Sequence, residues 1–229
     1  MRRLWVPSVN LGEVLLDRDE SHYARDVLRL QVGREVAVLD GTGASGVGVI
    51  IRVEQGGVAL RIDDVQGAPQ DPWSLVLGVA IPRQGASDWL VEKLVELGCS
   101  RLVWVDTERS LQKRGEGRQA RWERVAQAAT RQCRRVIPMD IEGPVPFHDF
   151  IDRKADLKWV GDPDGRTLGD MSLPCLGVIH GLIGPEGGFT EIELKAAKDA
   201  GYDQVCVSPH VLRVETAALA MAAVVIAML

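Results

Sequence analysis

The apolar and polar positions of the first 68 residues follow the pattern of short β-strands. The predicted strands lie at residues 4–6, 14–16, 35–39, 46–53 and 58–65. Gly-rich breaks separate them, and residues 40–43 (Asp-Gly-Thr-Gly) are typical of a turn. One short helix is expected at 21–28, and its periodicity would place Arg25 and Arg29 on one face. This part of the chain is therefore predicted to be a small β domain.

From Trp73 onward, strands and helices alternate. Strands are predicted at residues 74–81, 101–105, 157–160, 178–183 and 204–207, and helices at 88–97, 118–132, 190–200 and 215–229. This alternation is typical of an α/β domain with a mostly parallel sheet and helices on both faces. A glycine and two prolines at 67–72 suit a linker, so the predicted domains are 1–68 and 73–229.

Two loops near the end of the chain have an unusual composition. Residues 182–190 (LIGPEGGFT) and 207–216 (VSPHVLRVET) each follow a buried strand and lead into a helix, and ligands bind at this edge of open α/β sheets. Glycines in the first loop let a ligand approach the backbone, and the spacing fits neither a P-loop nor a dinucleotide fingerprint. Thr190 and Glu193 are predicted to form a capping box. A plain Gly-rich turn is the alternative for this loop taken alone.

The two loops together resemble a known family. The segments I-G-P-E-G-G (183–188) and V-L-R-V-E-T-A (211–217) are similar to those of the SPOUT superfamily of methyltransferases, and within it of the ribosomal RNA small subunit methyltransferase E family. Further matching segments lie at 92–98, 108–110 and 132–135, so the resemblance covers nearly the whole chain. The chain departs from the family pattern at Ser208 and His210, where the family has Gly-x-Arg, and at Arg134, which replaces a glycine.

This resemblance implies an enzyme that methylates N3 of a specific uridine in 16S rRNA with S-adenosylmethionine. It also implies a C-terminal SPOUT α/β domain with a deep trefoil knot, an N-terminal PUA-like β-barrel that binds RNA, and a homodimer.

The chemistry of methyl transfer indicates which residues would hold the cofactor. The sulfonium already activates the methyl group, so the protein mainly positions the reactants. Backbone groups and apolar side chains of the two loops suit this task. The candidate cofactor contacts are Leu182, Ile183, Gly184, Pro185, Glu186, Gly187, Gly188, Val207, Ser208, Val211, Leu212 and Thr216. Residues 161–165 are predicted as a turn, with one wall of the cofactor pocket as the alternative.

Uridine N3 becomes a good nucleophile after it loses its proton, and a cation that stabilises the resulting negative charge would help. Arg213 is the candidate for this catalytic role, and Glu186 or Glu215 would accept the proton or orient the arginine. For Glu215 the alternative is a favourable interaction with the positive end of the last helix dipole.

Charge is distributed unevenly along the chain. The net charge is −5, yet residues 109–135 contain nine Lys or Arg and two acidic residues, a local charge of +7. Such a local basic face can bind phosphates, because charges are screened within roughly 8–10 Å. A solvated helix face is the alternative. The candidate RNA contacts are Arg2, Arg3, Arg25, Arg29, Arg83, Arg109, Arg121, Arg124 and Arg135.

The remaining composition points to a cytoplasmic protein. Four scattered cysteines favour reduced thiols, and four histidines without ligand spacing predict no metal site. No signal peptide is predicted, and the apolar tail at 217–229 is too short to span a membrane. Because that tail is apolar all round, we expect it to be buried in a homodimer.

Two other functions stay open at this point. The chain could be another SPOUT RNA methyltransferase, acting on a ribose 2′-hydroxyl or a different base. It could also be a noncatalytic, dimeric RNA-binding protein.

Overall fold

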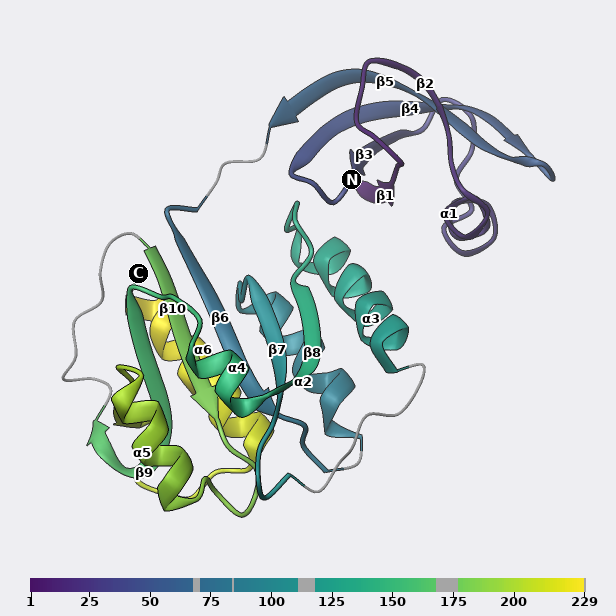
Figure 1. Ribbon diagram of the computed structural model, residues 1–229. Coiled ribbons are helices and arrows are strands. Elements are labelled where there is room, and N and C mark those ends of the chain that lie inside the picture. Colours follow the sequence, from purple (N-terminus) through teal and green to yellow (C-terminus); the bar gives the residue numbers. More distant parts are fainter. Residues whose placement is uncertain (68–70, 84, 111–117, 168–176, 229) are drawn as a thin grey trace. The chain divides into compact units, whose positions relative to one another are not determined.

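The computed structural model describes residues 1–67, 71–83, 85–110, 118–167 and 177–228 (Figure 1). The chain divides into two compact units. The first consists of Met1–Gln70 with Arg134–Pro138, and the second of Asp71–Cys133 with Met139–Leu229. No apolar pattern indicates that Arg134–Pro138 belong to the first unit.

The first unit is built on a five-stranded sheet with the strand order β1-β3-β4-β5-β2. The strands are β1 (Arg2–Trp5), β2 (Gly12–Leu15), β3 (Glu35–Leu39), β4 (Ala44–Glu54) and β5 (Gly57–Gly67). Strand β1 is parallel to β3 and the other pairs are antiparallel. Gly46 and Gly48 lack a Cβ where one would collide with the backbone of β5. The predicted β domain is thus confirmed.

The helix of the first unit ends earlier than its sequence pattern indicates. Helix α1 (Arg18–His22) continues as a π-helical turn, η1 (Tyr23–Val27), in which the N–H of Leu28 donates to the carbonyl of Tyr23. The chain then leaves the helix, and Arg29 adopts a left-handed φ of 53°. The prediction that Arg25 and Arg29 share a helical face is therefore wrong.

The second unit contains a six-stranded sheet in the order β11-β9-β10-β6-β7-β8, in which every neighbouring pair is parallel. The strands are β6 (Trp73–Ala80), β7 (Arg101–Asp106), β8 (Asp140–Pro146), β9 (Leu157–Thr167), β10 (Gly177–Ile183) and β11 (Asp203–Cys206). The predicted parallel sheet is confirmed. Strand β8 was missed because a glycine and two prolines interrupt its apolar pattern.

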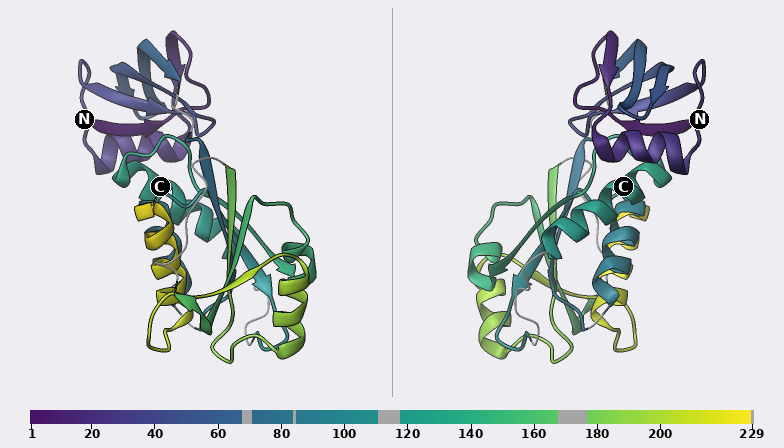
Figure 2. Two further views of the ribbon diagram at one scale, coloured as in Figure 1. Left: turned by 90° about the vertical axis from the view of Figure 1, so that its left-hand side faces the viewer. Right: turned by 90° about the vertical axis from the view of Figure 1, so that its right-hand side faces the viewer.

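Helices cover both faces of this sheet, as predicted (Figure 2). Helices α2 (Ala86–Glu96), α3 (Arg118–Cys133) and α6 (Val214–Met228) pack on one face, where Trp104 and Trp122 meet with ring centroids 4.8 Å apart. Helices α4 (Phe147–Ile151) and α5 (Glu191–Asp199) pack on the other. None of the helices in the described part of the chain is long and apolar enough to cross a membrane.

Strand β9 is longer than predicted and includes residues 161–165, for which a turn was expected. The strand continues to Thr167 and pairs with β11 on both sides of 161–165. Asp203 and Gln204 lie beside Trp159 and Val160, and Val205 and Cys206 lie beside Arg166 and Thr167, so that 161–165 form an irregular segment between these pairs. A Cβ at Gly165 would lie 2.6 Å from the backbone of Gln204. Glycine therefore serves here for the close approach of two strands and not for a turn.

Arg134, which replaces a glycine of the family pattern, directly follows α3 and has a φ of 67°. Glycine is favoured at this position after a helix because a left-handed backbone is strained for residues with a Cβ. The arginine therefore adopts a backbone conformation that favours glycine.

A histidine is buried between the sheet and α4. His180 on β10 is 3% exposed and stacks on Phe150, with ring centroids 5.4 Å apart. Its Nδ1 has no hydrogen-bond partner among the described residues. Burial lowers the pKa of His180 to about 4, and the positive charges of Lys158, Arg153 and Arg101 act in the same direction. His180 is thus neutral in the folded protein near pH 7.

The stability of the second unit is expected to fall by about 2 kcal/mol between pH 7 and pH 5 through His180 alone. The unfolded chain takes up a proton near pH 6.5, whereas the folded chain does so near pH 4. Stability is therefore lost as the pH falls through this window. Urea denaturation of the wild type and of His180→Gln measures the difference. An equally large loss in both proteins would contradict this assignment.

Candidate functional site

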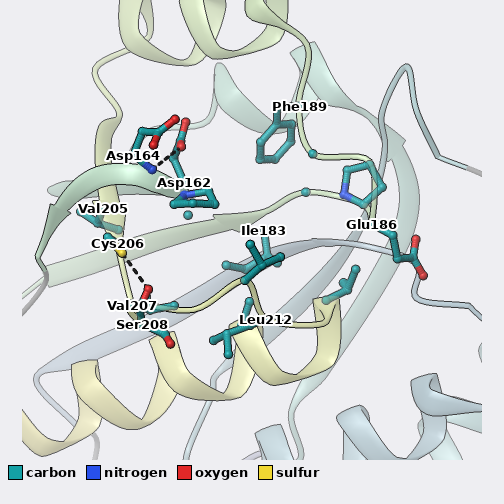
Figure 3. Close-up of a pocket in the computed structure, with 18 of the residues that line it drawn as sticks. Asp162, Asp164, Ile183, Glu186, Phe189, Val205, Cys206, Val207, Ser208 and Leu212 are labelled. Atoms are coloured by element: carbon teal, nitrogen blue, oxygen red, sulfur yellow. Dashed lines mark hydrogen bonds between the residues drawn. The ribbon is translucent and has the colours of Figure 1, made fainter.

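A cavity opens at the carboxyl edge of the parallel sheet, where the two unusual loops lie. Its volume is about 410 Å³, and its lining comes from β9, from the ends of β10 and β11 with their following loops, and from α5 and α6 (Figure 3). Figure 3 shows Ile183, Val207 and Leu212 on one side and the ring of Phe189 across from them. Segments that are distant in the sequence thus form one mainly apolar cavity.

The loop after β10 depends on its glycines for its own shape. A Cβ at Gly184 would lie 2.9–3.2 Å from the ring of Phe189, so glycine lets that ring pack on the loop backbone. Gly188 has a φ of 67°, and its N–H donates to the carbonyl of Pro185 at 2.8 Å. Thr190 and Glu193 form the predicted capping box at the start of α5. These contacts give the loop a defined course along the cavity.

A turn that follows β7 forms hydrogen bonds with the same loop and with the start of α5. Arg109 donates from Nη1 to the carbonyls of Gly187, at 2.7 Å, and of Phe189, at 3.4 Å. The N–H of Glu108 donates to the carboxylate of Glu193 at 2.9 Å. A Cβ at Gly187 would lie 3.4 Å from the aliphatic part of the Arg109 side chain, so this side chain packs against the glycine. Arg109 thus stabilises the loop through these hydrogen bonds.

Ser208, one of the departures from the family pattern, forms two hydrogen bonds within the loop after β11. The Oγ of Ser208 accepts the N–H of His210 at 3.1 Å, and its carbonyl accepts the thiol of Cys206 at 2.9 Å. Leu212 is half-buried, whereas Val211 is 86% exposed at the rim of the cavity.

Most of the predicted cofactor contacts lie around this cavity. Those that line it are Ile183, Gly184, Pro185, Glu186, Gly187, Gly188, Val207, Ser208, Val211 and Leu212. Leu182 is instead buried in the core on the α4 and α5 face, and Thr216 lies on the exposed side of α6.

Several lining residues were missed by the analysis of the sequence. Asp162, Asp164, Phe189, Cys206 and Ala217 also line the cavity. The two aspartates belong to the segment for which a pocket wall was the alternative interpretation. Their position follows from the pairing of β9 with β11, which no local pattern indicates.

The three candidate catalytic residues lie at different parts of the site. Arg213 is exposed directly before α6, and its carbonyl accepts the N–H of Ala217 at 2.8 Å. Glu215 is half-buried in the first turn of α6. Glu186 accepts the backbone N–H of Arg83 at 3.0 Å, and Figure 3 shows it at one end of the cavity.

The candidate RNA contacts differ in how many hydrogen bonds and ion pairs their side chains form within the protein. Arg25 bonds to Asp26 and to two carbonyls of β4 and its turn, and Arg121 pairs with Asp88. Arg3 donates to the carbonyl of Arg135 at 2.8 Å, within the first unit. Among the candidate contacts, Arg2, Arg29, Arg83 and Arg124 are also exposed; Nε of Arg83 lies 3.8 Å from Glu186, and Nε of Arg124 donates to the carbonyl of Ala120.

The sequence matches two family models. Residues 69–226 match a family described as RNA methyltransferase domain, and residues 16–63 match one described as RNA methyltransferase PUA domain. The first match covers most of the second unit, and the second match lies within the first unit.

Relatives and solved structures agree with these matches. The ribosomal RNA small subunit methyltransferases E of Synechocystis and of Mycobacterium bovis are 28% and 26% identical over 89% of this chain, covering 69% and 82% of their own lengths. The crystal structure of a ribosomal RNA small subunit methyltransferase E from Neisseria gonorrhoeae, bound to S-adenosylmethionine, matches with a TM-score of 0.88 and 27% identity, over 97% of this chain and 95% of that one. A Legionella pneumophila structure with bound S-adenosylmethionine matches with a TM-score of 0.88 and 27% identity, over 98% and 96%.

Proposed function

Because the chain belongs to the RNA methyltransferase family, and within it to the ribosomal RNA small subunit methyltransferase E family, we propose that it methylates N3 of a uridine in 16S rRNA. Members of this family use S-adenosylmethionine, and related structures contain it. The observation that supports the proposal most strongly is the cavity between the two loops, since those loops also contain the residues that resemble the family.

The cavity fits the cofactor in size and chemistry. Its volume of about 410 Å³ lies in the range of small-molecule sites, which are mostly apolar with a few polar groups. Ile183, Val207 and Leu212 would contact the adenine, and the backbone groups of residues 183–188 would bind its polar edge. When bound, the cofactor supplies an electrophilic methyl group.

The protein would then activate the uridine. N3 would accept the methyl group of the bound cofactor, which would leave as S-adenosylhomocysteine, and N3 would lose its proton. The proton of N3 goes to a base, for which Glu215 and Glu186 are the proposed residues. Arg213 would stabilise the negative charge that spreads to the uracil oxygens.

The substrate is proposed to be 16S rRNA in the cytoplasm, held by both units. The exposed arginines Arg2, Arg29 and Arg124 would contact phosphates, and rRNA affinity should accordingly fall steeply with salt concentration. Arg83, which lies beside Glu186, would contact RNA near the site.

The family resemblance also implies a homodimer, and α6 offers a surface for it. Most of this helix is apolar, yet Thr216, Ala223 and Ala227 are exposed and lie on one face. On α2, which packs beside α6, Trp89 is 48% exposed. A second copy of the chain that packs on this surface would bury it with two-fold symmetry.

S-adenosylmethionine is expected to protect Cys206 from alkylation by iodoacetamide, by roughly tenfold at saturation. Cys206 lines the cavity, and a bound ligand would cover its sulfur. Cys133 at the end of α3 is half-buried like Cys206 but lies away from the cavity, so it serves as an internal control. Peptide mass spectrometry measures both rates. Equal rates at Cys206 with and without the cofactor would place the cofactor elsewhere.

The decisive experiment is methylation of small ribosomal subunits or 16S rRNA from a strain that lacks the enzyme. Mass spectrometry of the nucleosides should show N3-methyluridine. A ribose-methylated or other base-methylated nucleoside would instead indicate a different RNA methyltransferase. Cofactor and RNA binding without any methylated product would indicate a noncatalytic RNA-binding protein.

A further inference from the structure

The charged side chains that belong to the described lining of the cavity are all acidic. In the described lining, the charged side chains are the carboxylates of Asp162, Asp164 and Glu186, without a lysine or arginine. Figure 3 shows Asp162 and Asp164 beside each other at one end of the cavity and Glu186 near the other. A cavity with this distribution favours a ligand that has a positive charge.

Two of the three carboxylates are engaged within the protein. Asp162 accepts the N–H of Asp164 at 2.9 Å with one oxygen and the side-chain amide of Gln204 at 3.0 Å with the other. Glu186 accepts the N–H of Arg83 at 3.0 Å, and Nε of that arginine lies 3.8 Å from the same oxygen. These two residues therefore connect the cavity wall to neighbouring strands and loops.

Asp164 is different. Its backbone is fixed, because its N–H donates to Asp162 and the next residue, Gly165, packs against the backbone of β11. Its side chain is exposed, and its carboxylate forms no hydrogen bond or ion pair with the described residues. A carboxylate in a defined place with both oxygens available is suited to a charge-assisted hydrogen bond with a ligand.

We propose that the carboxylate of Asp164 binds the α-ammonium group of S-adenosylmethionine and so selects a cofactor with a complete amino-acid end. This inference rests on the proposed function. The sulfonium is positive but has no hydrogen to donate, and the ribose hydroxyls donate but are neutral. The ammonium group combines a positive charge with three hydrogen-bond donors, so it complements Asp164 better than either.

The test is a cycle of two proteins and two ligands measured by calorimetry. The proteins are the wild type and Asp164→Asn, and the ligands are S-adenosylhomocysteine and its analogue with hydrogen in place of the α-amino group. The wild type should bind S-adenosylhomocysteine roughly 10- to 100-fold more tightly than the analogue. In Asp164→Asn this ratio should shrink to about two- or threefold, with the affinity for the analogue unchanged.

Each other outcome has a distinct meaning. Asp164→Asn would refute the proposal if it lowered the affinity for both ligands equally. Asp164 would then contact the nucleoside or stabilise the conformation of its loop. An unchanged affinity for S-adenosylhomocysteine, or a wild type that binds both ligands equally, would refute it as well. Asp199→Asn, an exposed carboxylate on α5 outside the cavity, controls for net charge. A wild type that binds neither S-adenosylmethionine nor these ligands would contradict the proposed function itself.

Discussion

Replacement of Arg213 by lysine is expected to lower the turnover of uridine methylation by roughly 10²-fold or more, the scale of losing one preorganised donor at a developing charge. A guanidinium presents two parallel donors to the planar carbonyl edge of uracil, whereas an ammonium is a point charge. Arg213 adjoins Leu212, which lines the cavity, and directly precedes α6. Affinity for S-adenosylmethionine should change little. Single-turnover kinetics at saturating cofactor and rRNA measure the effect.

Arg124→Gln is the matched control for this variant. Arg124 is exposed on α3, where its Nε donates to the carbonyl of Ala120 one turn earlier. Its loss should weaken rRNA binding and flatten the salt dependence of that binding, with turnover at saturation preserved. The reverse pattern for Arg213→Lys, normal turnover with weak cofactor binding, would make Arg213 part of the cofactor site and leave the charge on the uracil without an assigned partner.

Replacement of Ala223 by arginine is expected to weaken the proposed homodimer by roughly 10²-fold or more, because a charge would be buried in the interface without a partner. Ala223 is exposed in the single chain, so the same change should leave its fold intact. Light scattering at micromolar concentration, together with circular dichroism, measures association and folding separately.

An exposed alanine on another helix provides the control. Ala128 on α3 is also exposed, and Ala128→Arg should leave the dimer unchanged. A wild type that is monomeric at micromolar concentration would contradict the proposed dimer. If both variants dissociated the dimer, an added positive charge would disrupt association regardless of its position. The result would then contradict α6 as the interface.

Local patterns in the sequence predicted most elements of the fold. Alternating apolar residues predicted the β domain, and the capping box at Thr190 and Glu193 predicted the start of α5 to within one residue. The SPOUT-type α/β domain and the PUA-like β domain implied by the resemblance are confirmed by the comparisons and the sheet topology. The trefoil knot and the closed barrel stay predictions.

What the sequence could not predict depends on contacts between distant segments. The N–H of Arg83 reaches Glu186, and Arg109 reaches Gly187, across 103 and 78 residues. Similarly, Asp, Pro and Gly at 161–165 are turn residues, whereas these residues lie within strand β9, as an irregular segment between its two sites of pairing with β11. The placement of this segment depends on that pairing between distant segments.

The place of β11 at the edge of the sheet has a consequence for synthesis of the protein. This four-residue strand pairs with β9, and it precedes α6 by a single loop. The strands β6, β7, β8, β9 and β10 all leave the ribosome before it. During translation, therefore, the strands that precede β11 emerge while one wall of the cavity is still missing. If this cavity binds the methyl donor as proposed, a nascent chain could bind it only after β11 and the loop that follows have emerged.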